Sequence, residues 1–402
     1  MTRRPRPAGE GPDALLATAR SLWPGATVSA GGRGRAPDAG RAQLFAAVPD
    51  LAHARLLVPL GSPAAAGAAV CRLSAASGHR EVVTRLAADA ATRLTRGRVL
   101  RDRVVVHPVP DADALADHLA RRLGGPVTFA LGVGPARVNR KPVLQVFDER
   151  GHVAAFVKLG DSAQARADVG AEAAALRRLH EHRFERLVVP RVLDVSEWNG
   201  MLVLAMSALR PRPPVRHRTG PPLPAMRELA RVLQRPPSRL AELTWWRHLH
   251  ATIEGVPDEA LRTTLRHGWD AATERHGHRV VGVGAWHGDW TPWNMAHARS
   301  RTLVWDWERF EEGVPLGLDA THFEVQAAVR AHGLDPAVVG GVVDRLAGAS
   351  PYAALLADVY LLTIGARYAS LLGAELGDDV APSARVMAAA LAARLDVRKI
   401  SA

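Results

Sequence analysis

The chain has 402 residues, 48% of them apolar, a net charge of +12 and one cysteine. This length predicts two or three domains, and the lone Cys71 excludes an internal disulfide and a cysteine-rich zinc site. We expect a cytoplasmic protein, because no apolar run is long enough to span a membrane and the N-terminus lacks the apolar core of a signal peptide. The positive charge comes from scattered arginines without a nucleic-acid-binding motif, so we expect neither a nucleic-acid nor a membrane partner.

Residues 1–125 are predicted to form a small α/β accessory domain. The first forty residues are rich in Gly, Pro, Arg and Ala, and apolar runs with helical or alternating character follow them. An Asp at the start and a Gly at the end mark the last helix of this region. The runs predict strands at 54–61 and 103–109, and helices at 62–76, 80–94 and 111–124.

Residues 126–209 are predicted to form an antiparallel sheet with one long helix. Three consecutive apolar runs with short connections indicate a meander. Lys158 lies near the end of the third run, and a lysine inside an apolar strand needs a partner. Glu172, in the middle of the following helix, is the candidate partner. The strands are expected at 126–133, 141–148 and 152–160 and as a pair within 187–209, and the helix at 162–182.

The remainder, residues 210–402, is predicted to be mostly helical. It begins with a Pro- and Arg-rich linker and contains no internal repeat. The fold class is therefore predicted to be α+β. Helices are expected at 225–235, 237–253, 258–277 and through most of 317–400, and a strand at 302–310.

A polar loop wrapped in aromatic residues follows the third of these helices. The sequence HGDWTPWN contains His287, Asp289 and Asn294. Asp and Asn favour turns, and a preorganised site needs its polar loop held in one geometry. We therefore expect the neighbouring tryptophans to anchor the loop on the core: Trp290, Trp293 and Trp305.

Two residues of this region have the side-chain oxygens that Mg²⁺ prefers. Asn294 ends the loop, and Asp306 follows at the end of the next strand, in the sequence VWDWE. Such oxygens bind Mg²⁺ together with substrate phosphates. A further carboxylate, Asp289, could orient a hydroxyl nucleophile. Phosphoryl transfer requires this combination, because it depends on positioning and on charge neutralisation.

The ordered set of a strand lysine, a helix glutamate, HGDxxxxN and WDxE resembles the aminoglycoside phosphotransferase and choline kinase family, which are small-molecule relatives of protein kinases. The resemblance covers about residues 126–402. It implies a bilobal protein-kinase-like fold, with an antiparallel-sheet N-lobe at 126–209 and a helical C-lobe at 210–402 that carries the catalytic loop. It also implies phosphoryl transfer from ATP or GTP, with Mg²⁺, to a hydroxyl of a small molecule.

The resemblance further implies roles for individual residues. Asp289 would be the catalytic carboxylate, with His287 supporting the loop, and Asn294 and Asp306 would bind Mg²⁺. Lys158 would contact the α- and β-phosphates, held by Glu172. Asp319 would be a structural residue that opens the next helix.

The resemblance also implies that the nucleotide contacts the hinge and the first hairpin. The hinge is expected at 202–209, where backbone groups around Met206 and Ala208 would face the adenine. The first hairpin departs from the family pattern because it has only two glycines, so Arg137 is expected to assist with the phosphates. Residues 1–125 lie outside the family pattern.

Two other functions stay open. A catalytically inactive kinase-like binding protein would keep the fold, and a metal-dependent hydrolase could use His287, Asp289, Asp306 and His322 as ligands. The acceptor is open as well: aminoglycoside-like, amino-alcohol and sugar acceptors are all compatible. Residues 311–402 carry eleven acidic and seven basic residues, and a mildly acidic wall would suit a cationic amine.

Overall fold

The computed structural model describes residues 19–31, 42–107, 109, 113–132, 142–211, 220–373 and 377–395. The chain divides into two compact units. Unit 1 contains Met1–Leu73, Ser77–His180 and Pro190–Pro213. Unit 2 contains Ser74–Ala76, Glu181–Val189 and Pro214–Ala402.

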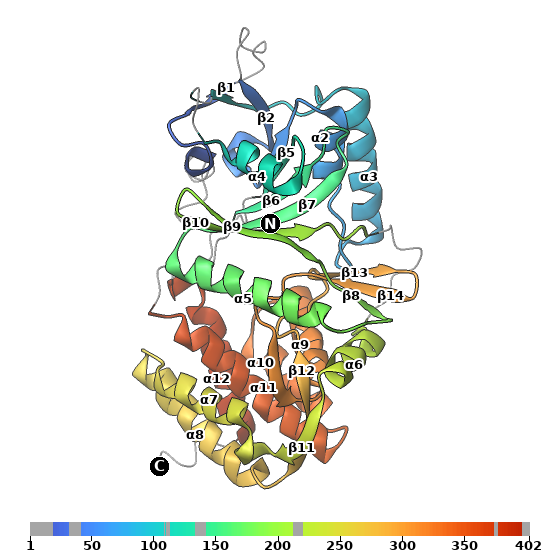
Figure 1. Cartoon of the computed structure of the whole chain (residues 1–402). Coiled ribbons are helices and arrows are strands. Elements are labelled where there is room, and N and C mark those ends of the chain that lie inside the picture. Colours follow the sequence, from blue (N-terminus) through green and yellow to red (C-terminus); the bar gives the residue numbers. More distant parts are fainter. Residues whose placement is uncertain are drawn as a thin grey trace. The chain divides into compact units, whose positions relative to one another are not determined.

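Unit 1 is built on one antiparallel sheet (Figure 1). Every pairing in this sheet is antiparallel. Within the described residues its strands lie in the order β1 (Thr27–Gly31), β4 (Arg103–His107), β2 (Gln43–Val48), β3 (Leu56–Pro59), β5 (Thr128–Gly132), β6 (Val143–Phe147), β7 (Val153–Gly160), β10 (Met201–Ser207) and β9 (Val192–Trp198). Its helices are α2 (Pro63–Val70), α3 (His79–Leu94), α4 (Leu115–Leu123) and α5 (Ala163–His180).

Both faces of this sheet are buried in unit 1. Side chains alternate between the faces of a strand, and β2 shows this directly: Phe45 packs in one core and Ala46 in the other. The first core contains Leu115 and Leu119 of α4, and the second contains the alanines of α2. Helix α5 packs on β7 and β10. The strands therefore need apolar residues on both sides, which explains the continuous apolar runs of the sequence.

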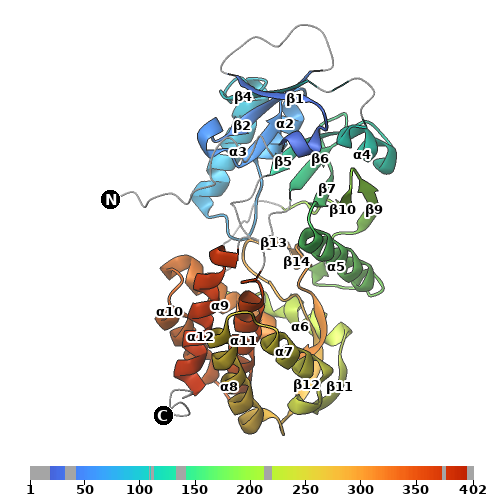
Figure 2. The same ribbon diagram turned by 90° about the vertical axis from the view of Figure 1, so that its left-hand side faces the viewer.

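Unit 2 consists mainly of helices packed around one core (Figures 1 and 2). Helix α11 lies at its centre, since every residue from Leu355 to Ala366 is buried. None of the described helices is both long enough and apolar enough to span a membrane. The helices are α6 (Leu223–Val232), α7 (Thr244–Glu254), α8 (Glu259–His276), α9 (Leu318–His332), α10 (Pro336–Ala347), α11 (Pro351–Ser370) and α12 (Ala381–Leu395), and short 3-10 turns occur at Leu240–Glu242 and Gly377–Asp379.

Two small sheets of unit 2 carry the polar loop between them. Strand β12 lies at the centre of one sheet, and the loop begins where β12 ends. The loop ends at the hairpin of β13 and β14, to which β8 adds in parallel. The strands are β11 (Arg235–Arg239), β12 (Val280–Trp286) and β15 (Glu311–Pro315) in the first sheet, and β13 (Met295–Ala298), β14 (Arg301–Val304) and β8 (Leu187–Val188) in the second.

The predicted α+β class, with an antiparallel sheet followed by a helical part, is confirmed. The division at residue 125 stays a prediction; in the structure, β3 pairs with β5, so strands from both sides of that position share one sheet in unit 1. Strands β1, β2, β11, β12, β13 and β15 were not predicted, and the strand expected at 302–310 is confined to β14.

Candidate active site

The polar loop at 287–294 packs on an aromatic cluster. Trp286, Trp290 and Trp307 are at most 1% exposed. The ring centroid of His287 lies 4.5 Å from that of Trp307 and 5.8 Å from that of Trp290. The expectation that tryptophans anchor the loop therefore holds for Trp290, whereas Trp293 and Trp305 are only half-buried and Trp307 was not foreseen.

His287 is a fully buried, neutral residue that links two segments of the loop. Its Nε2 lies 3.1 Å from the carbonyl oxygen of Trp305, which can only accept, so Nε2 carries the proton. Its Nδ1 accepts a hydrogen bond of 3.1 Å from the backbone N–H of Asp289. Burial lowers the pKa of His287 to about 4, against the opposing charges of Asp289 and Asp306. Both ring nitrogens are therefore engaged in hydrogen bonds to the chain, and the supporting role expected for His287 stays a prediction.

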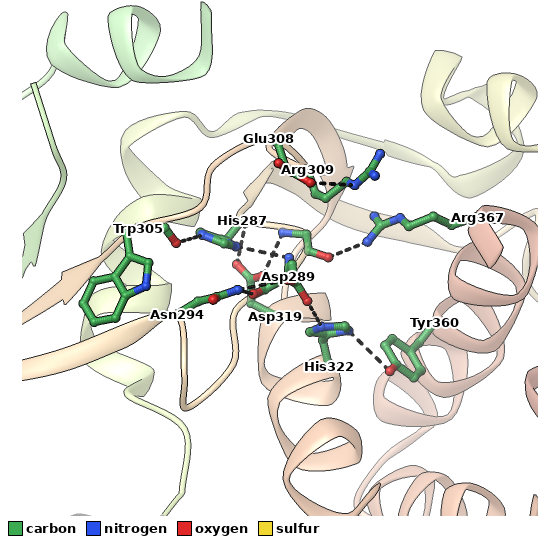
Figure 3. A network of polar contacts seen from close by, with 11 residues as sticks. His287, Asp289, Asn294, Trp305, Glu308, Arg309, Asp319, His322, Tyr360 and Arg367 are labelled. Carbon is green, nitrogen blue, oxygen red and sulfur yellow. Dashed lines mark hydrogen bonds and ion pairs between the residues drawn. The ribbon is translucent and has the colours of Figure 1, made fainter. Parts of the chain in front are cut away.

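Asp319 holds the first part of the loop from below (Figure 3). Its carboxylate accepts hydrogen bonds from the backbone N–H groups of His287, at 2.9 Å, and Gly288, at 3.2 Å. Burial raises its pKa to about 7, although both N–H donors act to lower it. The structural role expected for Asp319 is supported by these contacts, but it does not cap the helix: Gly317 is the N-cap of α9.

Asp289, the predicted catalytic carboxylate, is fixed on both oxygens and still reachable from solvent. Its Oδ2 accepts a hydrogen bond of 2.9 Å from Asn294 Nδ2, and its Oδ1 lies 3.0 Å from His322 Nε2. Its side chain is 35% exposed, whereas that of His322 is 2% exposed. A second molecule can thus reach this carboxylate on one side while the protein holds it on the other.

Asn294 and Asp306 fit the donor set of a hard cation. Asn294 donates its amide Nδ2 to the backbone and side chain of Asp289, so its Oδ1 is the atom left for a cation. The backbone N–H of Trp305 bonds the carbonyl oxygen of Asn294 at 3.0 Å, which brings Asp306 to the same end of the hairpin. Asp306 has a φ of 74°, a rare value for a non-glycine residue that clusters at functional sites. Both oxygens are the kind that Mg²⁺ binds.

The lysine and glutamate singled out in unit 1 form a buried ion pair. Lys158 of β7 is 8% exposed and Glu172 of α5 is fully buried, and their side chains are in direct contact. In the sheet, Lys158 faces Leu204 of β10 and Val143 of β6. The pairing expected from the sequence is therefore present, and the role of Lys158 toward phosphates stays a prediction.

The predicted hinge residues lie at the end of β10. Met206 is buried and pairs with Phe156 of β7. Ala208 follows the strand and is half-buried, and within the described residues its backbone makes no hydrogen bond. Arg137 lies outside the described residues.

A cavity of about 830 Å³ opens in unit 2, lined by Arg309 and Arg367 of the loop network. Arg367 donates a hydrogen bond of 2.6 Å to the carbonyl oxygen of Gly288, and its guanidinium lies 5.3 Å from the ring centroid of Trp286 (Figure 3). The cavity walls carry four glutamates: Glu242, Glu308, Glu311 and Glu312.

One of these glutamates is held without a cation. Glu311 Oε2 accepts hydrogen bonds from two indole N–H groups, of Trp245 at 3.2 Å and of Trp286 at 3.0 Å. Glu312 is paired with Arg235 at 3.1 Å, and Glu308 with Arg309 at 3.8 Å. Within the described part of the chain no ion pair joins a basic side chain to Glu311, although Arg235, Arg309 and Arg367 line the same cavity.

No family model and no curated protein matches the sequence. Among solved structures, the chain is similar to a thermostable mutant of the aminoglycoside phosphotransferase APH(4)-Ia in a ternary complex with ADP and hygromycin B. The identity is 14%, over 70% of this chain and 98% of that chain, with a TM-score of 0.47.

Two further solved structures are similar at the same level. The amicoumacin kinase hAmiN, in complex with AMP-PNP, Ca²⁺ and Ami, is 14% identical over 66% of this chain and 87% of that chain, with a TM-score of 0.41. ADP-bound APH(2'')-Ib is 10% identical over 70% and 99%, also with a TM-score of 0.41. A likeness of this degree concerns the fold, so the function has to be argued from the residues themselves.

The sequence did not reveal the residues that surround Asp289 from the helices. His322 was weighed only as a metal ligand, and Tyr360 and Arg367 were not considered. Asp319 and His322 are three positions apart on α9, so both face the loop from one side of the helix. That spacing of two polar residues in the first turns of the helix is the signal that could have found them.

Proposed function

We propose that this protein is a small-molecule kinase that transfers the γ-phosphoryl group of ATP or GTP to a hydroxyl group. The observation that supports it best is Asp289, a carboxylate held on both oxygens by Asn294 and His322 and yet 35% exposed. A residue that must receive or orient a substrate proton needs both properties.

The reaction assigns a simple task to each residue of the loop. The acceptor oxygen forms a bond to the γ-phosphorus, the bond from phosphorus to the bridging oxygen of the diphosphate breaks, and the acceptor proton passes to Asp289. Asn294 keeps Asp289 oriented through its amide N–H groups. The Mg²⁺ that Asn294 and Asp306 would hold neutralises phosphate charge when bound.

The nucleotide-binding residues proposed in unit 1 are Lys158, Glu172, Met206 and Ala208. The buried ion pair supports this role, because Glu172 supplies a counter-charge for the Lys158 ammonium inside an apolar strand. The backbone of Ala208, which makes no hydrogen bond within the described residues, could pair with the adenine or guanine edge.

The acceptor is proposed to carry an amine. Glu311 is one of four glutamates that line the 830 Å³ cavity, and its two indole donors fix its carboxylate without neutralising it. An ammonium group is the natural partner of such a carboxylate. This choice favours aminoglycoside-like and amino-alcohol acceptors over neutral sugars.

The test is transfer of phosphate to a panel of amine-bearing alcohols and neutral sugars, with ATP and with GTP, followed by mass spectrometry of the acceptor. Asp289→Asn should lower kcat on the order of 10³-fold. Asp335→Asn is the matched control: it makes the same change at the N-cap of α10, where Asn also caps, and should leave kcat unchanged.

Nucleotide binding is measured separately by thermal shift. ATP or GTP should raise the melting temperature of the wild type only with Mg²⁺, and Asp306→Ala should abolish this rise. Nucleotide binding without transfer to any acceptor would favour the inactive kinase-like protein. No binding of either nucleotide would contradict both proposals.

The hydrolase alternative receives less support from the geometry. It requires His287 as a metal ligand, and both ring nitrogens of His287 are engaged in hydrogen bonds to the chain. Among the described residues, no three of its four proposed ligands bring their ligand atoms within 4.8 Å of one another.

A further inference from the structure

A chain of hydrogen bonds leads from Asp289 into the core of unit 2 (Figure 3). Asp289 Oδ1 lies 3.0 Å from His322 Nε2, and His322 Nδ1 lies 3.4 Å from the hydroxyl of Tyr360. His322 is 2% exposed and Tyr360 is fully buried. His322 comes from α9 and Tyr360 from α11, so these two helices position the hydrogen-bonded groups.

The direction of each hydrogen bond follows from the groups involved. The Asp289 carboxylate can only accept, so His322 Nε2 must carry a proton. In a neutral imidazole Nδ1 then accepts, and the Tyr360 hydroxyl is its donor.

Burial keeps the proton on the Tyr360 hydroxyl. It raises the pKa of Tyr360 well above its ordinary value, so the phenol retains its proton. A histidine whose Nδ1 receives that proton as a hydrogen bond has its tautomer fixed, with the other proton on Nε2. The donor toward Asp289 is therefore built in before any substrate arrives.

We propose that His322 and Tyr360 are positioning residues for Asp289: Tyr360 fixes the tautomer of His322, and His322 Nε2–H holds Asp289 Oδ1 in the orientation for proton acceptance. This inference rests on the proposed function for its effect on rate. It adds the orientation of Asp289 Oδ1, which neither the residues of the loop motif nor those of the cavity provide. The proton of His322 stays on Nε2 throughout, and only Asp289 exchanges a proton with the acceptor.

The kinetic test compares substitutions that keep or remove the donor. His322→Leu removes the N–H and should lower kcat 10- to 100-fold, as loss of an outer partner of a site residue commonly does. His322→Gln retains an N–H donor and should recover part of this loss. Tyr360→Phe removes only the hydroxyl and should lower kcat by less than His322→Leu does. The KM for the nucleotide should not change in any of them.

Two controls separate positioning from general damage. Thr273→Val removes a hydrogen bond of 3.1 Å to Trp246 elsewhere in unit 2 and should leave kcat unchanged. In the Asp289→Asn background, His322→Leu should cause no further loss, because residues that act as a unit are not additive. An additive loss, or a Gln variant as slow as the Leu variant, would overturn the proposal.

A spectroscopic test does not depend on activity. The ¹⁵N shifts of His322, assigned by the loss of its signals in His322→Gln, should report a neutral ring with the proton on Nε2. In Tyr360→Phe the signals should move toward a mixture of tautomers. A proton on Nδ1 in the wild type, in either a neutral or a charged ring, would contradict the positioning role proposed for His322 and Tyr360. If the shifts agree but no acceptor is phosphorylated, the hydrogen-bond arrangement stands and the proposed function fails.

Discussion

Gly288 occupies a position in the polar loop at 287–294 where a side chain has no room. Its φ is 78°, and a Cβ placed there would lie 2.1 Å from the carbonyl oxygen of Arg309. We predict that Gly288→Ala lowers the free energy of unfolding by about 2 kcal/mol or more, since strain and a backbone clash add. Urea denaturation measures it. Gly333→Ala is the control, because Gly333 has a φ of 96° with open space around it; equal losses in the two variants would contradict the clash.

The buried His287 makes stability depend on pH. Its pKa is about 4 in the folded chain and near 6.5 when unfolded, so the unfolded state binds a proton that the folded state does not. The contribution of His287 is present above pH 6.5 and is lost as the pH falls toward 4. Because buried Asp319 has a raised pKa and acts in the opposite sense, the comparison needs a variant.

The variant His287→Gln isolates this effect. We predict that the stability advantage of the wild type over His287→Gln shrinks by about 3 kcal/mol between pH 7 and pH 4. Urea unfolding at several pH values measures the difference, and Asp319 cancels because both proteins contain it. A difference that stays constant with pH would show that the pKa of His287 is the same in the folded and the unfolded chain.

For single residues, the sequence predicts a pair when one member cannot be buried without its partner. Lys158 in an apolar strand requires a counter-charge, and Glu172 in the next helix supplies it. His322 and Tyr360 show no such need: a single histidine and a single tyrosine on separate helices are ordinary core residues. Only the packing of α9 against α11 makes them partners of Asp289.

Among the elements, helix α6 fastens β8 through one side chain. Glu228 accepts hydrogen bonds from three consecutive backbone N–H groups, those of Glu185, Arg186 and Leu187, at 2.6 to 2.8 Å. Glu228→Gln replaces one acceptor oxygen with a donor that faces N–H groups. We predict a loss of about 1–2 kcal/mol in the free energy of unfolding.

Hydrogen exchange checks this prediction at the amides themselves. The amides of residues 185–187 should exchange faster in Glu228→Gln, because they lose their acceptor. Glu274→Gln, an exposed position on α8, should leave them unchanged. Unchanged exchange in Glu228→Gln would mean that pairing with β14 alone holds β8.

Two of the strands that were not predicted, β12 and β11, contain residues with low strand propensity. Central strand β12 contains Gly282 and Gly284, yet a Cβ at Gly284 would lie 2.4 Å from the carbonyl oxygen of Ala230 in α6. Gly284 serves a close helix–strand contact that no local pattern reveals. Edge strand β11 contains two prolines, which an edge tolerates because one side of it donates to no neighbour.

For the molecule as a whole, a buried carboxylate links three helices of unit 2. Asp358 of α11 is fully buried, lies 2.8 Å from His276 Nε2 of α8, and contacts Arg275 and Arg394 as well. Asp358→Asn removes the buried carboxylate from these basic groups, of which, among the described residues, Arg394 alone keeps a second partner, Asp344. We predict that it destabilises unit 2 by about 3 kcal/mol.

Because each unit has its own hydrophobic core, the effect should stay within one of them. Hydrogen exchange followed by mass spectrometry along the chain would show faster global exchange in unit 2 peptides of Asp358→Asn. Asp194→Asn is the control in unit 1, where the same type of change removes the partner of Arg122. Equal acceleration in both units would show that the two cores unfold as one.

The two indole hydrogen bonds to Glu311 also give the protein an intrinsic fluorescence reporter. Trp245 and Trp286 share one carboxylate oxygen as hydrogen-bond acceptor, so a cation drawn to Glu311 changes the field around both indoles. Indole emission responds to such a change in local charge. Among the ten tryptophans of the chain, these two join the cavity to an intrinsic fluorescence signal. Arrival of an acceptor amine could thus be followed by light, without a label and before any phosphate is transferred.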